Sequence, residues 1–183
     1  MAEYSMTAPL KPEDVDKLRA GDKVNLTGFI YTARDAAHKK LVELIKEGKP
    51  LPLPLEGQII YYVGPSPTPP GKAIGSAGPT TSFRMDPYAP LLIERGLRGM
   101  IGKGERAPGV VEAMQKHGAV YFAATGGAAA LLSKRITAAE VIAYPELGAE
   151  AIRRLTVVNF PVIVAQDCHG GNIYREGQRQ YAR

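Results

Sequence analysis

The nine residues from Gly78 to Asp86 include the side chains of this chain that are best suited to bind a small anion. The glycine and proline at the start of this loop favour a turn. The three hydroxyls that follow, among them those of Thr80 and Thr81, can donate and accept hydrogen bonds. Arg84 comes shortly after them and offers a planar guanidinium that matches a carboxylate or a phosphate. Hydroxyls and a guanidinium at this spacing therefore predict an anion-binding site.

A helix is expected to begin where this loop ends. Asp86 is a good N-cap residue, Pro87 suits the first helical position and Gly96 suits the end, so we predict a helix over 86–95. Arg84 would then lie just before a helix N-terminus, where free N–H groups and the helix dipole also favour an anion. A plain capped helix with Arg84 on the surface fits the same pattern, and the spacing alone does not choose between these interpretations.

Two further cations stand where predicted strands end. Residues 23–31 alternate as a half-buried strand does, and Arg34 follows them at the start of an amphipathic helix. Lys103 lies between two glycines directly after a strand predicted at 97–101. Because α/β folds place ligands at strand ends, Arg34, Lys103 and the Thr80–Arg84 loop together suit a small dicarboxylate, with one arginine for each carboxylate.

The other predicted elements are those that must hold these loops in place. We expect further strands at 58–63, 73–77, 119–124, 141–144 and 162–165, helices at 34–48 and 108–118, helical turns at 12–18 and 149–154, and a hairpin turn at 170–172. Strands and helices alternate irregularly, which favours an α/β fold with mixed sheets and helices on one side over a doubly wound sheet. The 183 residues suffice for a single domain. Within it we expect an extended arm at 1–10 and a polar tail at 175–183.

Composition argues against several classes of function. The net charge is +5, but the basic residues are dispersed and the tyrosines do not interleave with them as a stacking platform would, so no nucleic acid is expected as a partner. No run of about 18 apolar residues occurs, and the N-terminus lacks the basic and apolar regions of a secretory signal. We therefore expect a cytoplasmic protein without a membrane segment. No Ser-His-Asp pattern or nucleophile elbow is present.

The single cysteine limits the metal chemistry of the chain. One thiol, Cys168, can form neither an internal disulfide nor a thiolate cluster site by itself, and an idle thiol is expected. His117 and His169 lie far from each other and from His38, so we expect no metal bound by this chain. His38 is expected to be structural or partly exposed. The glycine pair at 126–127 could bind a phosphate, although close backbone packing is the more common role of such a pair.

Several separated motifs occur in the order seen in one known family. They are Thr32–His38, Gly78–Asp86, Gly102–Gly104, Tyr144–Gly148, Phe160–Pro161 and Asp167–Asn172. Together they resemble the β subunit, or C-terminal domain, of the class I iron–sulfur fumarate hydratases and L-tartrate dehydratases. The resemblance extends from Pro9 to Tyr174, and motifs in register over nearly the whole chain are more specific than any one of them.

This resemblance implies a swivelling β/β/α domain and a hydro-lyase that adds water to, or removes it from, a four-carbon dicarboxylate. In the family a 4Fe–4S cluster is held by three cysteines of the α subunit. The chain is therefore expected to be the β subunit of an α2β2 heterotetramer, inactive without its cysteine-bearing α subunit. Fumarate is the expected substrate, with L-tartrate or mesaconate as alternatives. A non-catalytic module that binds a small anion is a further alternative.

The resemblance also implies roles for the residues singled out above. Arg34 and Arg84 would clamp the substrate carboxylates, and Thr81 would contribute to substrate binding. Thr80 would take or relay the C3 proton, and Lys103 would reach the substrate. An unperturbed alcohol is a poor base at neutral pH, so Thr80 would need cationic neighbours or a relay from a carboxylate of the α subunit.

Overall fold

The computed structural model describes residues 1–124 and 128–181, so the glycine pair at 126–127 lies outside the described residues. The strands within this part of the chain are β1 (Glu3–Ala8), β2 (Lys23–Thr32), β3 (Ile59–Tyr61), β4 (Gly99–Gly102), β5 (Val120–Ala123), β6 (Ile136–Ala143) and β7 (Ile152–Gln166). The helices are α1 (Pro12–Asp16), α2 (Asp35–Lys46), α3 (Ala89–Glu94), α4 (Pro108–His117), α5 (Ala129–Ser133) and α6 (Ile173–Tyr181), with 3-10 turns η1 (Ser82–Met85) and η2 (Pro145–Glu150). None of the described helices is long and apolar enough to cross a membrane.

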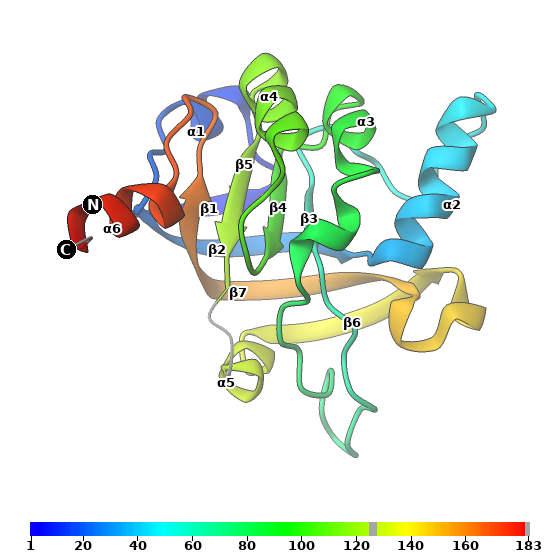
Figure 1. Ribbon diagram of the computed structural model, residues 1–183. Helices are drawn as coiled ribbons and strands as arrows, with labels where there is room; N and C mark the ends of the chain where they lie inside the picture. The colour runs from blue at the N-terminus through cyan, green and yellow to red at the C-terminus, as the bar shows by residue number, and fades with distance from the viewer. Residues whose placement is uncertain (125–127, 182–183) are drawn as a thin grey trace.

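The strands form one mixed sheet that closes partly on itself. Its order is β1-β2-β3-β4-β5-β7-β6, with β7 also paired to β2. The pairs from β1 to β5 are parallel, whereas β7 runs antiparallel to β2, β5 and β6. Because β7 pairs with both β2 and β5, the strands β2, β3, β4, β5 and β7 make a barrel-like ring. Figure 1 shows α3 and α4 side by side against β3, β4 and β5.

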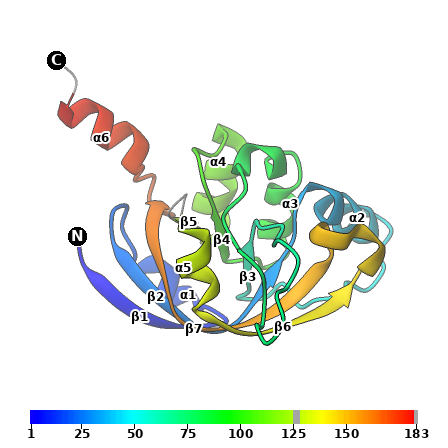
Figure 2. The same ribbon diagram turned by 90° about the horizontal axis from the view of Figure 1, so that it is seen from below.

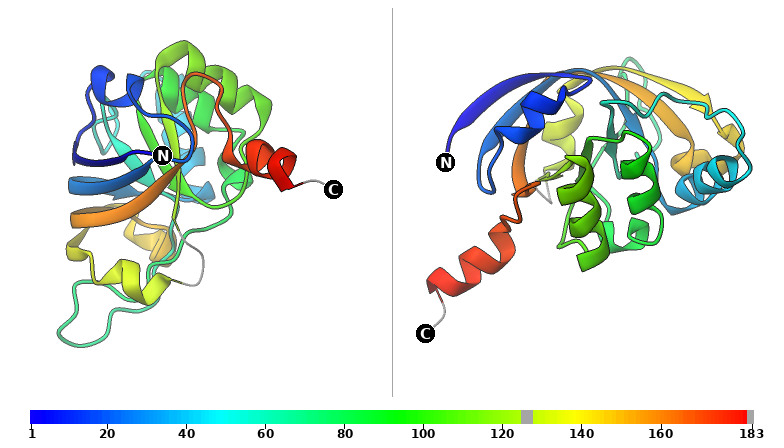
Figure 3. Two further views of the ribbon diagram at one scale, coloured as in Figure 1. Left: turned by 90° about the vertical axis from the view of Figure 1, so that its left-hand side faces the viewer. Right: turned by 90° about the horizontal axis from the view of Figure 1, so that it is seen from above.

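Helices and sheet form distinct layers. Figure 2 shows β1, β2, β7 and β6 as a curved layer, with α2, α3 and α4 on its concave side. In Figure 3 the last helix, α6, extends away from the rest of the molecule. The arrangement confirms the expectation of a mixed α/β fold in which helices cover one side of the sheet.

Alternate residues of the short parallel strands face two different apolar cores. In β3, Ile59 and Tyr61 belong to the core inside the ring of strands. Ile60, Tyr62 and Met100 belong to the core between these strands and the helices. Both faces of the short strands β3 and β4 are therefore buried, as is usual for parallel strands in the interior of a fold. This double burial fixes the register of β3 and β4, and the loops after these strands are fixed with it.

The helix after the hydroxyl-rich loop begins later than predicted. Residues 82–85 form the 3-10 turn η1, and α3 starts only at Ala89. Asp86 does not cap α3. Its carboxylate instead accepts hydrogen bonds from Arg106 Nε at 2.7 Å and from the backbone N–H of Ala107 at 2.9 Å. A tertiary ion pair has replaced the local cap that the sequence pattern favours.

Three other local predictions were wrong. Residues 73–77 form a loop with bends at Ala73 and Gly75, because Ser66 Oγ accepts a hydrogen bond from the N–H of Ser76 and the N–H of Ser66 donates to the carbonyl of Ser76. The helical turn predicted at 149–154 ends at Glu150, and the strand β7 begins two residues later. The turn at 170–172 is closed by an antiparallel bridge between Gln166 and Asn172, but it leads from β7 into α6 and not into a second strand.

Candidate anion-binding site

The residues predicted to bind an anion come together at the carboxyl ends of β2, β3 and β4. Arg34 follows β2 directly. The N–H of Thr80 donates to the carbonyl of Tyr62, just after β3, at 2.7 Å. Thr81 pairs with Lys103 in a parallel bridge just after β4. The parallel strands end at one edge of the sheet, so residues far apart in the sequence share one surface.

Asp35 joins the two arginines of the site. Its Oδ2 accepts a hydrogen bond from Arg84 Nη2 at 2.7 Å, and its Oδ1 lies 3.7 Å from Arg34 Nη2. Arg34 Nη2 also pairs with Glu150 Oε1 at 3.1 Å. The Arg34 side chain crosses Gly64, where a Cβ would lie 2.8 Å from Nη1, so a side chain at this position would displace the guanidinium. No local sequence pattern predicts this role for Asp35, although it directly follows Arg34.

The site combines a buried donor, unpaired within the described part of the chain, with cationic and hydroxyl groups that are accessible to a ligand. Arg34 Nε is buried and has no hydrogen-bond partner among the described residues. Thr80 and Thr81 are half-buried, while Lys103 is exposed and the Arg84 side chain is 44% exposed. Arg34 and Arg84 pair with the carboxylates of Asp35 and Glu150, and Lys103 leaves one net positive charge at this edge of the sheet. A small anion is therefore favoured over a cation.

Arg106, which no sequence pattern singled out, supports the site from the buried core. Its side chain is fully buried, and its guanidinium lies 5.2 Å from the Tyr62 ring centroid and 5.1 Å from that of Tyr121. Burial acts to lower the pKa of Arg106, but Tyr62 and Asp86 raise it by more. The net pKa is above its usual value, so the guanidinium is charged. The 2.7 Å ion pair with Asp86 ties the loop after Lys103 to the end of η1. No local pattern links these two residues in the sequence.

The 3-10 turn η1 packs closely against the end of strand β4. The Tyr121 hydroxyl donates to the carbonyl of Gly104 at 2.8 Å and accepts from Ser82 Oγ at 2.8 Å. Burial raises the pKa of Tyr121, so this hydroxyl keeps its proton at neutral pH. A Cβ at Gly102 would overlap the Ser82 hydroxyl. The absence of a side chain at Gly102 therefore allows the hydroxyl-rich loop to lie against the end of β4.

His38 holds the backbone of Arg34. The imidazole is fully buried rather than partly exposed, and its Nδ1 lies 2.8 Å from the carbonyl oxygen of Arg34. Because a carbonyl only accepts hydrogen bonds, Nδ1 carries the proton. Burial lowers the pKa of His38 to about 4, so the ring is neutral near pH 7. His38 is thus a structural residue of the first turns of α2.

A family model described as the fumarase C-terminus matches residues 2–177. The chain belongs to this family. It is 44% identical over 156 residues to the anaerobic class I fumarate hydratase of Escherichia coli (strain K12), a match that covers 84% of this chain and 28% of that protein. It is 40% identical over 169 residues to fumarate hydratase 2 of Leishmania major, with coverages of 87% and 30%. The chain thus spans less than a third of the length of these fumarase relatives.

A third relative of the fumarase C-terminus family has nearly the same length as this chain. It is a protein of Methanocaldococcus jannaschii with the provisional name L(+)-tartrate dehydratase subunit beta, 41% identical over 180 residues. The match covers 95% of this chain and 92% of that protein. The family resemblance drawn from the motifs is therefore confirmed. The roles of Arg34, Thr80, Thr81, Arg84 and Lys103 stay predictions, which the site geometry makes testable.

Proposed function

We propose that this chain is the β subunit of a two-subunit class I fumarate hydratase, which hydrates fumarate reversibly to L-malate. The observation that carries the proposal is the pair of arginines, Arg34 and Arg84, held by Asp35 beside the loops of Thr80 and Lys103. Relatives in the same family are named fumarate hydratases. The arrangement offers two guanidiniums, one ammonium and two threonine hydroxyls, which suits a substrate with a carboxylate at each end.

The arginines would bind and orient the substrate. Each guanidinium can donate two parallel hydrogen bonds to one carboxylate, so the pair fixes the direction of the carbon chain between them. Asp35 Oδ2 already accepts a hydrogen bond from Arg84 Nη2 at 2.7 Å, which restricts the arginine side chain. The side chain therefore loses less conformational entropy when substrate binds than a free arginine would.

The hydroxyls and Lys103 would handle the proton and the developing charge. Removal of the C3 proton from malate places negative charge on the neighbouring carboxylate, and cations fixed nearby stabilise it. Thr80 and Thr81 lie next to the backbone of Lys103, since Thr81 pairs with it in a parallel bridge. The ammonium would stabilise a Thr80 alkoxide, so Thr80 can hold the proton or relay it to a carboxylate of the partner.

The iron–sulfur cluster implied by the family does not fit this chain. A 4Fe–4S cluster of this type needs three cysteine thiolates, whereas the chain contains one cysteine. That thiol, Cys168, follows β7 and lies 3.9 Å from the carbonyl oxygen of Val15, at the end of α1. We therefore propose that a cysteine-bearing α subunit holds the cluster, that the two subunits form an α2β2 heterotetramer in the cytoplasm, and that this chain is inactive alone.

L-tartrate dehydration is the second candidate function. It is supported by the relative named as a tartrate dehydratase subunit, of which this chain covers 92%. Tartrate and malate share two carboxylates and differ by one hydroxyl, so the arginine pair would serve both substrates. The additional hydroxyl of tartrate would contact groups other than the two arginines. Assays on both substrates are therefore needed to choose between the two functions.

The test is an anaerobic assay of the chain, alone and co-expressed with a cysteine-bearing α subunit, on fumarate, L-malate and L-tartrate. Activity is expected only in the pair, together with iron–sulfur absorbance. Arg84→Ala should lower kcat/KM by about 10²-fold or more, because a charge partner of the substrate is lost. The matched control is Arg154→Ala, which breaks an exposed pair with Glu140 on β6.

Two outcomes would contradict the proposal. Full activity in the Arg84→Ala complex would remove Arg84 from the substrate site. A cluster-loaded complex without activity on any of the three substrates would favour a non-catalytic module that binds a small anion. Calorimetric titration of the chain with fumarate and L-tartrate would then test direct binding, and loss of that binding in the Arg84→Ala variant would locate the anion.

A further inference from the structure

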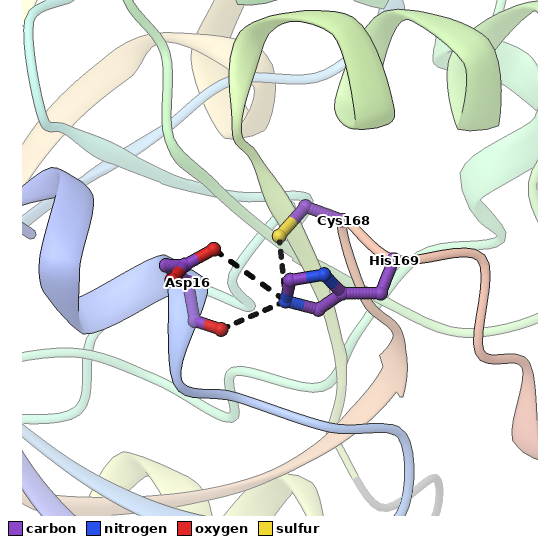
Figure 4. A group of neighbouring side chains, drawn as sticks. All are labelled: Asp16, Cys168 and His169. Atoms are coloured by element: carbon purple, nitrogen blue, oxygen red, sulfur yellow. Dashed lines mark hydrogen bonds and ion pairs between the residues drawn. The ribbon is translucent and has the colours of Figure 1, made fainter.

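We propose that Asp16, Cys168 and His169 bind a zinc ion, at the opposite end of β2 from Arg34. Asp16 is the last residue of α1, and the other two residues lie in the turn after β7. Their ligand atoms all lie within 4.8 Å of one another. Figure 4 shows the three side chains converging, with one imidazole nitrogen facing both the thiol of Cys168 and Asp16.

The distances between the ligand atoms are close to those of a tetrahedral zinc site. Cys168 Sγ lies 3.4 Å from His169 Nε2, and Nε2 lies 3.7 Å from Asp16 Oδ1. Zinc bonds of the usual length, set at the tetrahedral angle, separate a sulfur from a nitrogen by about 3.5 Å and a nitrogen from an oxygen by about 3.4 Å. Asp16 and His169 are exposed and Cys168 is half-buried, so small rotations of these side chains would bring the three atoms to coordinating positions.

A buried carboxylate holds the two ligand-bearing segments together. Asp167 is only 2% exposed. Its Oδ1 accepts hydrogen bonds from the N–H groups of His169 at 2.8 Å and Gly171 at 2.9 Å. Its Oδ2 accepts one from the N–H of Ala20 at 2.7 Å, in the segment that follows α1. The backbone of the site is thus fixed without a metal, which lowers the entropic cost of binding one.

The ligand set favours zinc over harder cations. A thiolate with an imidazole suits Zn²⁺, whereas Mg²⁺ and Ca²⁺ prefer oxygen ligands. The imidazole Nε2 now lies 2.7 Å from the carbonyl oxygen of Asp16, to which it donates. On binding, the imidazole proton would reside on Nδ1 and the thiol proton would pass to the solvent. The Asp16 side chain is 81% exposed, so a water molecule can complete the coordination.

The strand register separates this group from the anion-binding site. Lys23, at the start of β2, pairs with Ile163 of β7, whereas Tyr31, near its end, pairs with Arg154. The turn after β7 therefore lies beyond the start of β2, and Arg34 follows its end. A zinc ion here would not touch the substrate. It would link α1 to the turn between β7 and α6, in a chain that the sequence analysis expected to bind no metal.

The test is a titration of the purified, reduced and chelator-treated chain with Co²⁺, followed by Zn²⁺. We expect one equivalent of Co²⁺ to produce a sulfur-to-cobalt charge-transfer band, which Zn²⁺ then abolishes, and Zn²⁺ to raise the thermal unfolding midpoint. Cys168→Ser should remove the band and the thermal shift. Asp16→Asn should weaken binding by about tenfold or more. His117→Ala, which changes a histidine on α4, should leave both signals unchanged.

The absence of a charge-transfer band at one equivalent would overturn the proposal. So would a band that persists in Cys168→Ser, because the thiolate would then not be a ligand. Circular dichroism of the three variants would show whether each is folded. Asp16→Asn changes only an exposed side chain, so it keeps the test valid if Cys168→Ser does not fold: binding of unchanged affinity in this variant would also refute the site.

Discussion

Protonation of His38 should destabilise the fold, because the buried imidazole has no partner for a second proton among the described residues. Its Nδ1 donates to the carbonyl oxygen of Arg34 at 2.8 Å. Its Nε2 is buried and finds no hydrogen-bond partner in the part of the chain that the structure describes. Burial lowers the pKa of His38 from 6.5 to about 4. In the unfolded chain the same residue has an ordinary pKa of about 6.5.

The sign and size of the effect follow from these two values. Because the pKa is depressed in the folded state, the unfolded chain binds more protons between the two values, and stability falls as the pH falls. The contribution of His38 is complete above the unfolded pKa and is lost progressively down to about pH 4. Between about pH 7.5 and about pH 4.5 the loss amounts to about 2.5 kcal/mol of unfolding free energy.

Urea denaturation at a series of pH values measures this loss. The informative variant is His38→Asn, whose amide can still donate to the Arg34 carbonyl but does not titrate. The fall in unfolding free energy towards acid should be smaller in this variant by about 2.5 kcal/mol, whatever its stability at neutral pH. His117→Asn, which replaces a histidine of α4, serves as the control for this substitution. Equal slopes in wild type and His38→Asn, or an imidazole pKa near 6.5 by NMR, would refute the reasoning.

Two further stability predictions test the packing beneath the site. Gly102→Ala should cost about 1–3 kcal/mol, because the new Cβ overlaps the Ser82 hydroxyl. Gly109→Ala lies in α4, where the new Cβ would meet no described atom within 4 Å apart from its chain neighbours and the backbone of its own helix, and it should instead stabilise by up to about 1 kcal/mol. Urea midpoints of opposite sign would confirm the pair, and equal shifts would contradict it. Arg106→Gln should cost about 3–5 kcal/mol, since it leaves the Asp86 carboxylate without its buried partner. The control Arg154→Gln breaks an exposed pair and should cost no more than about 1 kcal/mol. A similar loss of unfolding free energy in the two arginine variants would show that burial of Arg106 does not matter.

Local patterns in the sequence determined the helices and the anion-binding groups well. The helix predicted at 34–48 is α2 (Asp35–Lys46), because apolar residues at helical spacing mark the face that must be buried. The helix predicted at 108–118 is α4, which ends at Gly118 in the left-handed conformation that glycine adopts easily. Arg34, Arg84 and Lys103 could be singled out because each stands next to a predicted strand or helix end.

The closure of the sheet was decided by long-range pairing. The sequence predicted a strand only at 162–165, yet β7 extends from Ile152 to Gln166 and pairs with β2, β5 and β6. Its first residues match a helical turn as well as a strand, and only pairing with two neighbouring strands decides between them. Residues 73–77 show the opposite case, in which a predicted strand did not form. Their composition is typical of a strand, but they pair with no strand among the described residues and form a loop closed by Ser66.

The sequence by itself thus determined which groups can bind an anion, and the tertiary structure decided how they are held. The partner of Arg84 is Asp35, 49 residues away, and that of Arg106 is Asp86, 20 residues away. Neither spacing follows the period of a helix or a strand, so no local pattern predicts these ion pairs. They form because parallel strands end at one edge of the sheet, where cations from several loops meet and carboxylates must offset their mutual repulsion.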